Sequence, residues 1–245
     1  MNKIVLTIPY YENPKMLEYQ LSVWRKYPPF VRNQLEIIVV DDGSQNSLAS
    51  NILSGVGGME FNLKVFRFQK DIPWNHGSAR NLAVAHCAED REWIILTDID
   101  HVIPQQSMHR LITMKLDPSK TYCPQRMKAV GTSNIQHIRH TDTFIIHREV
   151  FNAIGGFDER FAGYWNGVSY PFRKVVREMT KVVDLQDVYF IFHEQDNISD
   201  ANTQLGREDS EYDIKHAPRK LYKQFRQNIQ DYKPERIEQQ WTQQL

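Results

Sequence analysis

The sequence has few cysteines and no long apolar run. Cys87 and Cys123 are the only cysteines among 245 residues, and neither lies at the spacing of a metal-binding pair. Two separate thiols favour a reducing compartment, since small secreted domains commonly depend on disulfides. No segment has the length of apolar chain that spans a bilayer, and the first eight residues predict a strand rather than a secretion signal. We therefore expect a soluble, cytoplasmic protein, with peripheral attachment to a membrane as an alternative.

The chain also lacks an excess of charge of either sign. Its 30 Lys and Arg residues balance 30 Asp and Glu residues, so no overall field attracts phosphates. Five basic residues do gather in one segment: Arg126, Lys128, His137, Arg139 and His140. That segment either contacts an anionic acceptor or forms a solvated loop. Because basic and acidic residues balance over the chain, a nucleic-acid partner is not expected.

Strands and helices alternate through the first half of the chain. Apolar, β-branched runs predict strands over residues 3–8, 35–40, 63–68 and 93–97. Helical spacing or helix-start residues follow each strand, near residues 14, 47, 78 and 104. This order implies parallel βαβ units with right-handed crossovers. The sequence therefore predicts an α/β fold with a mostly parallel central sheet flanked by helices.

The second half has a different rhythm. Strands are predicted over 141–147, 182–184 and 188–192, with a short helix that begins at Arg148. From about residue 207 the chain is polar and rich in glutamine. Such a tail is either a helical extension packed on the domain or partly disordered, and we expect it to act as surface cover.

Polar residues follow three of the predicted parallel strands. They form the segments Pro9-Tyr10-Tyr11-Glu12, Asp41-Asp42-Gly43-Ser44 and Asp98-Ile99-Asp100-His101. The carboxyl ends of parallel strands meet at one edge of a sheet, where α/β proteins bind ligands. Two carboxylates and an imidazole within four positions could hold a divalent cation, whereas a solvated strand end is the alternative. The sequence thus predicts a ligand site at this edge.

Four motifs stand in order along the chain. They are Ile-Val-Val-Asp-Asp-Gly-Ser at 38–44, Asn-His-Gly-Ser-Ala-Arg-Asn at 75–81, Thr-Asp-Ile-Asp at 97–100 and Gly-Gly-Phe-Asp-Glu at 155–159. Together they resemble glycosyltransferases of the GT-A fold, above all family 2, with some likeness to polypeptide N-acetylgalactosaminyltransferases and galactosyltransferases. The resemblance covers residues 1 to about 163. It implies a GT-A domain over 1–205, with a nucleotide-binding half (1–115) and an acceptor half (116–205), and a polar helical extension over 206–245. A Rossmann dehydrogenase is disfavoured because no Gly-x-Gly-x-x-Gly follows the first strand.

The resemblance also implies roles for individual residues. The nucleotide-sugar pocket would be lined by Pro9, Tyr10, Glu12, Asp41, Asp42, Asn75, Gly77, Arg80, Asp98 and Asp100. Asp42 would bind the base or ribose, and Arg80 would lie near the diphosphate. Asp100 would coordinate Mn²⁺ or Mg²⁺, and Asp98 would approach the ribose or sugar or act as a further metal ligand. His193 is either another metal ligand or a partly buried histidine at a strand end. Such a metal neutralises the leaving nucleoside diphosphate as a Lewis acid. His101 is disfavoured as a metal ligand, since it is expected to point away from Asp100.

The chain departs from the family 2 pattern after Gly-Gly-Phe-Asp-Glu. The family continues with Phe-x-Gly-Trp-Gly-x-Glu-Asp, whose last residue is the expected general base, whereas this chain lacks the acidic pair. Another acid could serve as base, the candidates being Glu194, Asp196, Asp158 and Glu159. A retaining mechanism could instead use the leaving phosphate, or transfer activity could be lost. Tyr164 and Trp165 are candidate platforms for the acceptor sugar, although buried aromatic residues are the more common case.

The expected function is metal-dependent transfer of a hexosyl or N-acetylhexosaminyl group from a UDP- or GDP-linked donor to a hydroxyl acceptor. The acceptor could be a glycan or a lipid-linked saccharide. One alternative is a nucleotide-sugar-binding protein without transfer activity. A nucleotidyltransferase is a weaker alternative, because Pro9-Tyr10-Tyr11-Glu12 is not the glycine-rich basic loop that such enzymes carry after the first strand.

Overall fold

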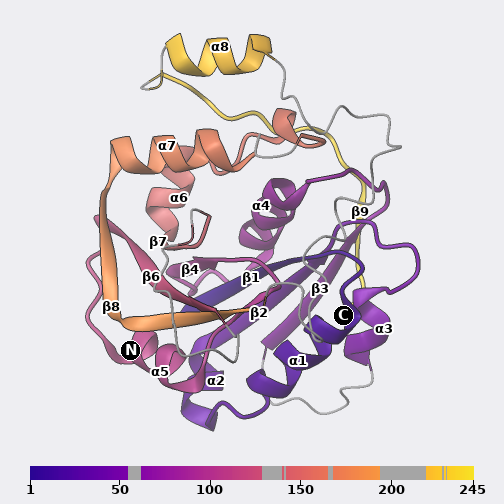
Figure 1. Ribbon diagram of the computed structural model, residues 1–245, viewed down its shortest axis with the longest axis vertical. Helices are drawn as coiled ribbons and strands as arrows, with labels where there is room; N and C mark the ends of the chain where they lie inside the picture. Colours follow the sequence, from indigo (N-terminus) through magenta and orange to yellow (C-terminus); the bar gives the residue numbers. More distant parts are fainter. Residues whose placement is uncertain are drawn as a thin grey trace.

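The computed structural model describes residues 1–54, 62–128, 140, 142–164, 168–193, 219–227, 229 and 231–245. Within these residues a nine-stranded sheet has the strand order β5-β8-β6-β7-β4-β1-β2-β3-β9 (Figure 1). Its strands are β1 (Ile4–Tyr10), β2 (Leu35–Asp41), β3 (Asn62–Phe68), β4 (Trp93–Leu96), β5 (His101–Val102), β6 (Lys120–Lys128), β7 (Phe144–His147), β8 (Lys181–Phe192) and β9 (Trp241–Gln243). The helices are α1 (Pro14–Trp24), α2 (Pro29–Gln34), α3 (Ala49–Ser54), α4 (His76–His86), α5 (Gln105–Thr113), α6 (Arg148–Ile154), α7 (Ser169–Met179) and α8 (Arg219–Gln227).

The centre of the sheet is parallel, as predicted. Strands β3, β2, β1 and β4 pair side by side in the same direction. β2 and β4 are buried along their whole length and consist largely of apolar and β-branched residues. Such runs suit strands that are covered on both faces. The four strands predicted in the first half of the chain are confirmed, with ends that differ by one or two residues.

Helices cover both faces of this parallel centre. Apolar residues of α1, α2, α3 and α5 form one core cluster with alternate residues of β1, such as Leu6. Residues of α4, α6, α7 and α8 form a second cluster with the opposite face, which includes Val5. Adjacent residues of a strand point to opposite faces, so a single strand contributes to both clusters.

The outer strands make the sheet mixed. β7 runs antiparallel to β4 and β6, while β6 and β8 are parallel to each other. The two strands predicted over 182–184 and 188–192 are one strand, β8, whose register against β6 shifts after Pro124. β6 is not among the predicted strands, because its sequence mixes lysines and polar residues with a proline. Proline cannot donate to a strand ladder, and here it stands at the irregularity in the pairing.

The C-terminal region is only partly helical. Phe225 of α8 is 1% exposed and packs into the second core cluster, so this helix docks on the domain, which is one of the two alternatives given for the tail. The last residues, however, form β9, which pairs antiparallel with β3 at the edge of the sheet. The tail is thus a part of the sheet as well as surface cover. The boundaries proposed near residues 115 and 205 stay predictions.

Among the residues that the structure describes, no helix has the length and apolar character needed to cross a bilayer.

Candidate active site

The strand ends predicted to meet do lie side by side. In the parallel pairing of β1 with β2, Tyr10 lies opposite Asp41, and Thr7 of β1 lies opposite Leu96 of β4. The segments that follow β1, β2 and β4 therefore leave the sheet at the same edge. This edge carries most of the polar residues expected to bind a nucleotide sugar.

Asp41 has a structural role at this edge. Its carboxylate is 1% exposed and accepts hydrogen bonds from the backbone N–H groups of Ser44 (2.8 Å) and Ala49 (2.9 Å). These bonds close the turn after β2 and cap the start of α3. Burial raises the pKa of the Asp41 carboxyl. Since both oxygens are bonded within the protein, these contacts favour support of the loop over direct contact with a ligand.

Glu12 supports the same loop from the neighbouring strand end. Its carboxylate accepts hydrogen bonds from the N–H groups of Asn46 (2.7 Å) and Ser47 (3.0 Å). The loop also depends on Gly43, whose φ of +82° favours glycine and whose position would bring a Cβ within 2.8 Å of the Asp71 Cα atom. The tight turn places the loop directly beside Asp42.

Asp42 is the acid that faces α4. It is 2% exposed, and its Oδ1 atom accepts a hydrogen bond from Asn75 Nδ2 at 3.1 Å. Asn75 stands at the N-cap of α4, but its side chain makes no capping bond to that helix. Two residues later, a Cβ on Gly77 would lie 2.0 Å from Val168 Cγ1 and 3.1 Å from Phe157 Cβ. Glycine therefore lets α4 approach the second half of the chain closely.

Arg80 is a buried cation with free donor capacity. Its side chain is fully buried, and Nη2 donates to Asp98 Oδ1 (2.5 Å) and to the Thr97 carbonyl (3.3 Å). The guanidinium also lies over the Phe157 ring, 5.4 Å from its centroid. Among the residues that the structure describes, Nε and Nη1 have no hydrogen-bond partner. Buried donors of this kind normally have a partner, so the arrangement suits an anionic ligand.

Asp98 is ionised by its surroundings. Burial acts to raise the pKa of this carboxyl, but the Arg80 guanidinium and the imidazoles of His140 and His101 hold it well below its usual range. The Asp98 side chain remains about one-third exposed, at 33%. A charged carboxylate at this position can therefore be reached by a ligand or a metal ion.

His101 points toward Asp100, so the expectation that it would point away was wrong. Its Nδ1 atom lies 2.7 Å from Asp100 Oδ1, while the buried Nε2 atom has no hydrogen-bond partner within the described part of the chain. The ring stacks on Phe192, with centroids 4.9 Å apart, and lies 4.5 Å from the His140 ring. Because β5 consists of only two residues, the sequence pattern could not indicate this side-chain direction.

Three side chains form a group that can hold a metal ion. One ligand atom from each of Asp98, His101 and His140 lies within 4.8 Å of the others. Burial and the neighbouring His101 lower the pKa of His140 to about 4, so this imidazole is neutral at pH 7. One carboxylate and two imidazole nitrogens suit a divalent transition metal. The donor set therefore fits a divalent cation.

The predicted metal ligand His193 lies next to Asp100 in the fold. Its backbone N–H donates to the Asp100 carbonyl at 2.9 Å, and its ring packs edge-on against Tyr19 at 5.1 Å. In the part of the chain that the structure describes, the group of candidate ligands does not include the side chains of Asp100 and His193. Their assignment as ligands therefore stays a prediction.

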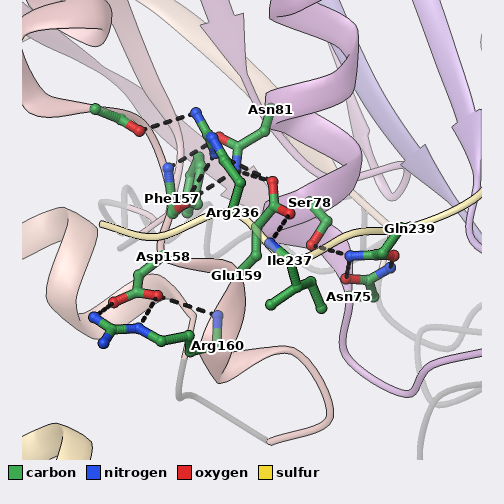
Figure 2. A network of polar contacts seen from close by, with 11 residues as sticks. Asn75, Ser78, Asn81, Phe157, Asp158, Glu159, Arg160, Arg236, Ile237 and Gln239 are labelled. Carbon is green, nitrogen blue, oxygen red and sulfur yellow. Dashed lines mark hydrogen bonds and ion pairs between the residues drawn. The ribbon is translucent and has the colours of Figure 1, made fainter. Parts of the chain in front are cut away.

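Asn81 joins the Ala-Arg-Asn motif to the Gly-Gly-Phe-Asp-Glu motif (Figure 2). Its Nδ2 donates to the Phe157 carbonyl (2.9 Å) and to Glu159 Oε1 (2.7 Å), and its Oδ1 accepts from Phe157 N–H (2.9 Å). Burial raises the pKa of Glu159. These bonds hold α4, and with it Arg80, against the second half of the chain.

The C-terminal region adds contacts that the sequence analysis missed. Arg236 donates to the carbonyls of Phe157 (2.9 Å) and Gly155 (2.9 Å), and Gln239 bonds with Asn75 (Figure 2). These pairs are separated by 79 to 164 positions in the sequence. No local pattern marks such residues.

Comparison with known sequences identifies the family. The sequence profile described as glycosyl transferase family 2 matches residues 7–196, which is most of the chain. The chain belongs to glycosyltransferase family 2. This confirms the resemblance that the four motifs indicated. Among curated proteins, no sequence matches the chain.

Solved structures confirm the GT-A fold. The mannosyltransferase PcManGT from Pyrobaculum calidifontis, solved with GDP-Man and Mn²⁺, aligns with a TM-score of 0.63 at 15% identity, over 95% of this chain and 66% of that one. Residues 1–349 of S. aureus TarS, solved with UDP-GlcNAc, align with a TM-score of 0.62 at 17% identity, over 80% of this chain and 60% of that one. The catalytic domain of Drosophila β1,4-galactosyltransferase 7 aligns with a TM-score of 0.57 at 11% identity, over 97% of this chain and 85% of that one. This family 2 chain thus spans less than two-thirds of the length of the first two structures.

The candidates for a general base in this glycosyltransferase lie in two places. Asp158 is buried, and its carboxylate accepts hydrogen bonds from the Arg160 guanidinium (2.7 and 3.0 Å) and from the Tyr232 hydroxyl. These contacts favour a structural role for Asp158. Glu194 and Asp196, like the acceptor candidate Trp165, fall outside the described residues. Tyr164 is half-buried, next to Gly163, whose N–H donates to the Pro73 carbonyl at 2.8 Å, close to the start of α4.

Proposed function

We propose that this family 2 glycosyltransferase transfers a sugar from a nucleoside-diphosphate donor to a hydroxyl acceptor. The observation that carries the proposal is Arg80, a fully buried guanidinium with two nitrogen atoms that have no hydrogen-bond partner among the described residues. It lies at the sheet edge that also holds Asp42 and the group of possible metal ligands. A diphosphate would supply the acceptor oxygens that these donors require.

Asp42 would bind the nucleoside part of the donor. Its carboxylate accepts a hydrogen bond from Asn75 Nδ2 at 3.1 Å. A carboxylate oxygen has lone pairs to accept further hydrogen bonds, which ribose hydroxyls or a base edge can donate. The fold neighbours solved with GDP-Man and UDP-GlcNAc support a nucleotide-sugar donor.

A divalent metal ion, Mn²⁺ or Mg²⁺, would be held by Asp98, His101 and His140. When bound, it would neutralise charge on the departing diphosphate. Asp100 would orient His101, since a metal-bound histidine usually donates its other ring N–H to a carboxylate. The contact between His101 Nδ1 and Asp100 leaves Nε2 available as the ligand atom.

The function is tested by assays of donor binding, donor hydrolysis and sugar transfer with UDP- and GDP-sugars in the presence of Mn²⁺. Asp42→Asn should weaken donor binding about tenfold or more, because the amide places donor hydrogens where a carboxylate oxygen accepts them. Asp90→Asn, a change at an exposed surface ion pair with Lys3, is the matched control and should leave binding unchanged. A wild-type protein that binds donor but neither hydrolyses nor transfers it, across a panel of acceptors, would instead be a nucleotide-sugar-binding protein. The missing acidic pair after residue 159 is the observation that favours this second function.

The metal ligands are tested separately by Mn²⁺ titration followed by electron paramagnetic resonance. His101→Ala and His140→Ala should each weaken Mn²⁺ binding at least tenfold. Asp100→Asn should have a smaller effect, because an amide oxygen can still accept from His101 Nδ1. If His193→Ala and Asp100→Asn abolish binding while His140→Ala does not, the assignment of His140 is wrong and the ligands predicted from the family resemblance are favoured.

A further inference from the structure

The last residues of the chain cross from the Gly-Gly-Phe-Asp-Glu loop to the edge of the sheet. We call residues 231–245 the C-terminal strap. At one end, Ile237 N–H donates to Glu159 Oε2 at 3.2 Å, and Glu159 N–H donates to the Glu235 carbonyl at 2.9 Å. At the other end, β9 pairs with β3. The strap lies outside residues 7–196, the range that matches the family profile.

Gln239 lies between these two anchors and reaches the start of α4 (Figure 2). Its Oε1 accepts from Asn75 Nδ2 at 2.8 Å, and its Nε2 donates to Asn75 Oδ1 at 3.3 Å and to Ser78 Oγ at 2.9 Å. Asn75 is fully buried and Ser78 is 3% exposed. The two amides therefore form a reciprocal pair in a place that water does not readily reach.

This pair determines which way the Asn75 amide points. Asn75 Nδ2 carries two hydrogens, and it donates both to Gln239 Oε1 and to Asp42 Oδ1. A half-turn of the amide would place Asn75 Oδ1 against the Asp42 carboxylate, where two acceptors would repel each other. Gln239 opposes that half-turn, because Gln239 Oε1 would then face Asn75 Oδ1, and Gln239 Nε2 would face Asn75 Nδ2. The orientation of Asn75 is thus set from the strap.

We propose that Gln239 is a positioning residue for nucleotide binding, which acts through Asn75 to hold the Asp42 carboxylate ready for the nucleoside of the donor. The proposal rests on the assignment of Asp42 to the nucleoside under the proposed function. It gives the strap a role in donor affinity beyond covering the surface. It also assigns part of the donor site to residues more than 30 positions beyond the family match.

Calorimetric titration with UDP and with GDP, each in the presence of Mn²⁺, tests the proposal on the full chain. Gln239→Ala should weaken nucleotide binding about three- to tenfold, the range expected for loss of one or two buried hydrogen bonds. Gln240→Ala is the matched control, since its side chain is exposed on the same strap, and it should leave the affinity unchanged. Arg236→Gln loosens the strap at its other contacts and should lower the melting temperature without changing nucleotide affinity.

Two further comparisons separate positioning from mere anchoring. If Gln239 acts through Asn75, then Asn75→Ala combined with Gln239→Ala should weaken binding no more than Asn75→Ala alone. Additive losses, or a Gln239→Ala protein that melts earlier but binds nucleotide like wild type, would overturn the proposal. If Asp42→Asn leaves nucleotide affinity unchanged, the nucleoside assignment of Asp42 fails and the role of Gln239 fails with it. If Asp42→Asn weakens binding and Gln239→Ala does not, only the role of Gln239 is wrong.

Discussion

Replacement of Asn81 by alanine should destabilise the domain substantially, because this side chain joins its two halves. Asn81 is 5% exposed and makes three hydrogen bonds, two with the backbone of Phe157 and one with Glu159. Phe157 is only 1% exposed, so in the alanine variant water does not readily replace Asn81 as the partner of the Phe157 N–H. The Phe157 carbonyl and Glu159 each keep a bond to Arg236.

The magnitude follows from these contacts. A buried donor left without a partner costs about 1–3 kcal/mol, and each of the two remaining losses costs less because a second partner stays in place. We therefore expect the free energy of unfolding to fall by about 2–4 kcal/mol. For a chain of this size, each kcal/mol lowers the melting temperature by about 2–4 °C.

Urea denaturation followed by circular dichroism measures this change. Asn152→Ala, at an exposed asparagine of α6, is the control and should change stability by less than about 0.5 kcal/mol. Asn81→Asp keeps an acceptor for Phe157 N–H but adds a second carboxylate beside Glu159. Burial already raises the pKa of Glu159, so the stability of Asn81→Asp should fall further below wild type as the pH rises from 5 to 8. An Asn81→Ala protein as stable as Asn152→Ala would refute the reasoning.

Three other changes test the site. Gly77→Ala should cost about 1–3 kcal/mol in thermal denaturation, because its Cβ would lie 2.0 Å from Val168 Cγ1. Asp41→Ala removes the cap of α3 and should cost about 1–2 kcal/mol in urea denaturation, whereas no loss would mean that the cap is dispensable. Arg80 holds the pKa of Asp98 low, so this pair stabilises the wild type above the ordinary Asp pKa, and that stability is lost on acidification. In Arg80→Met this acid-dependent loss should become smaller when urea denaturation at pH 2.5 and 6 is compared, and an unchanged pH dependence would contradict the assignment.

The strands at the centre of the sheet could be predicted because their residues carry local information. β2 is a continuous run of buried residues that ends in an acid. Its predicted end differs from the observed end by one residue, which does not change the face of the sheet that each side chain occupies. Parallel strands place their carboxyl ends at one edge, so the proximity of Asp42 and Asp98 to that edge follows from the strand order. The order of the four motifs likewise indicated the family that the profile match confirms.

Local sequence patterns are thus sufficient to predict the α/β core, the sheet edge that carries the acids, and the family. They do not predict which side chains meet at that edge, because this depends on how distant segments pack together. The direction of His101, its approach to His140 and the contact of Gln239 with Asn75 depend on segments that are far apart in the chain. Polar residues in irregular segments have no periodicity, because their partners are set by packing rather than by the pitch of a helix or strand. Hydrogen bonds and metal ligand sets form between side chains that are close in space. The residues next to a side chain in the sequence do not show which distant segment will pack against it.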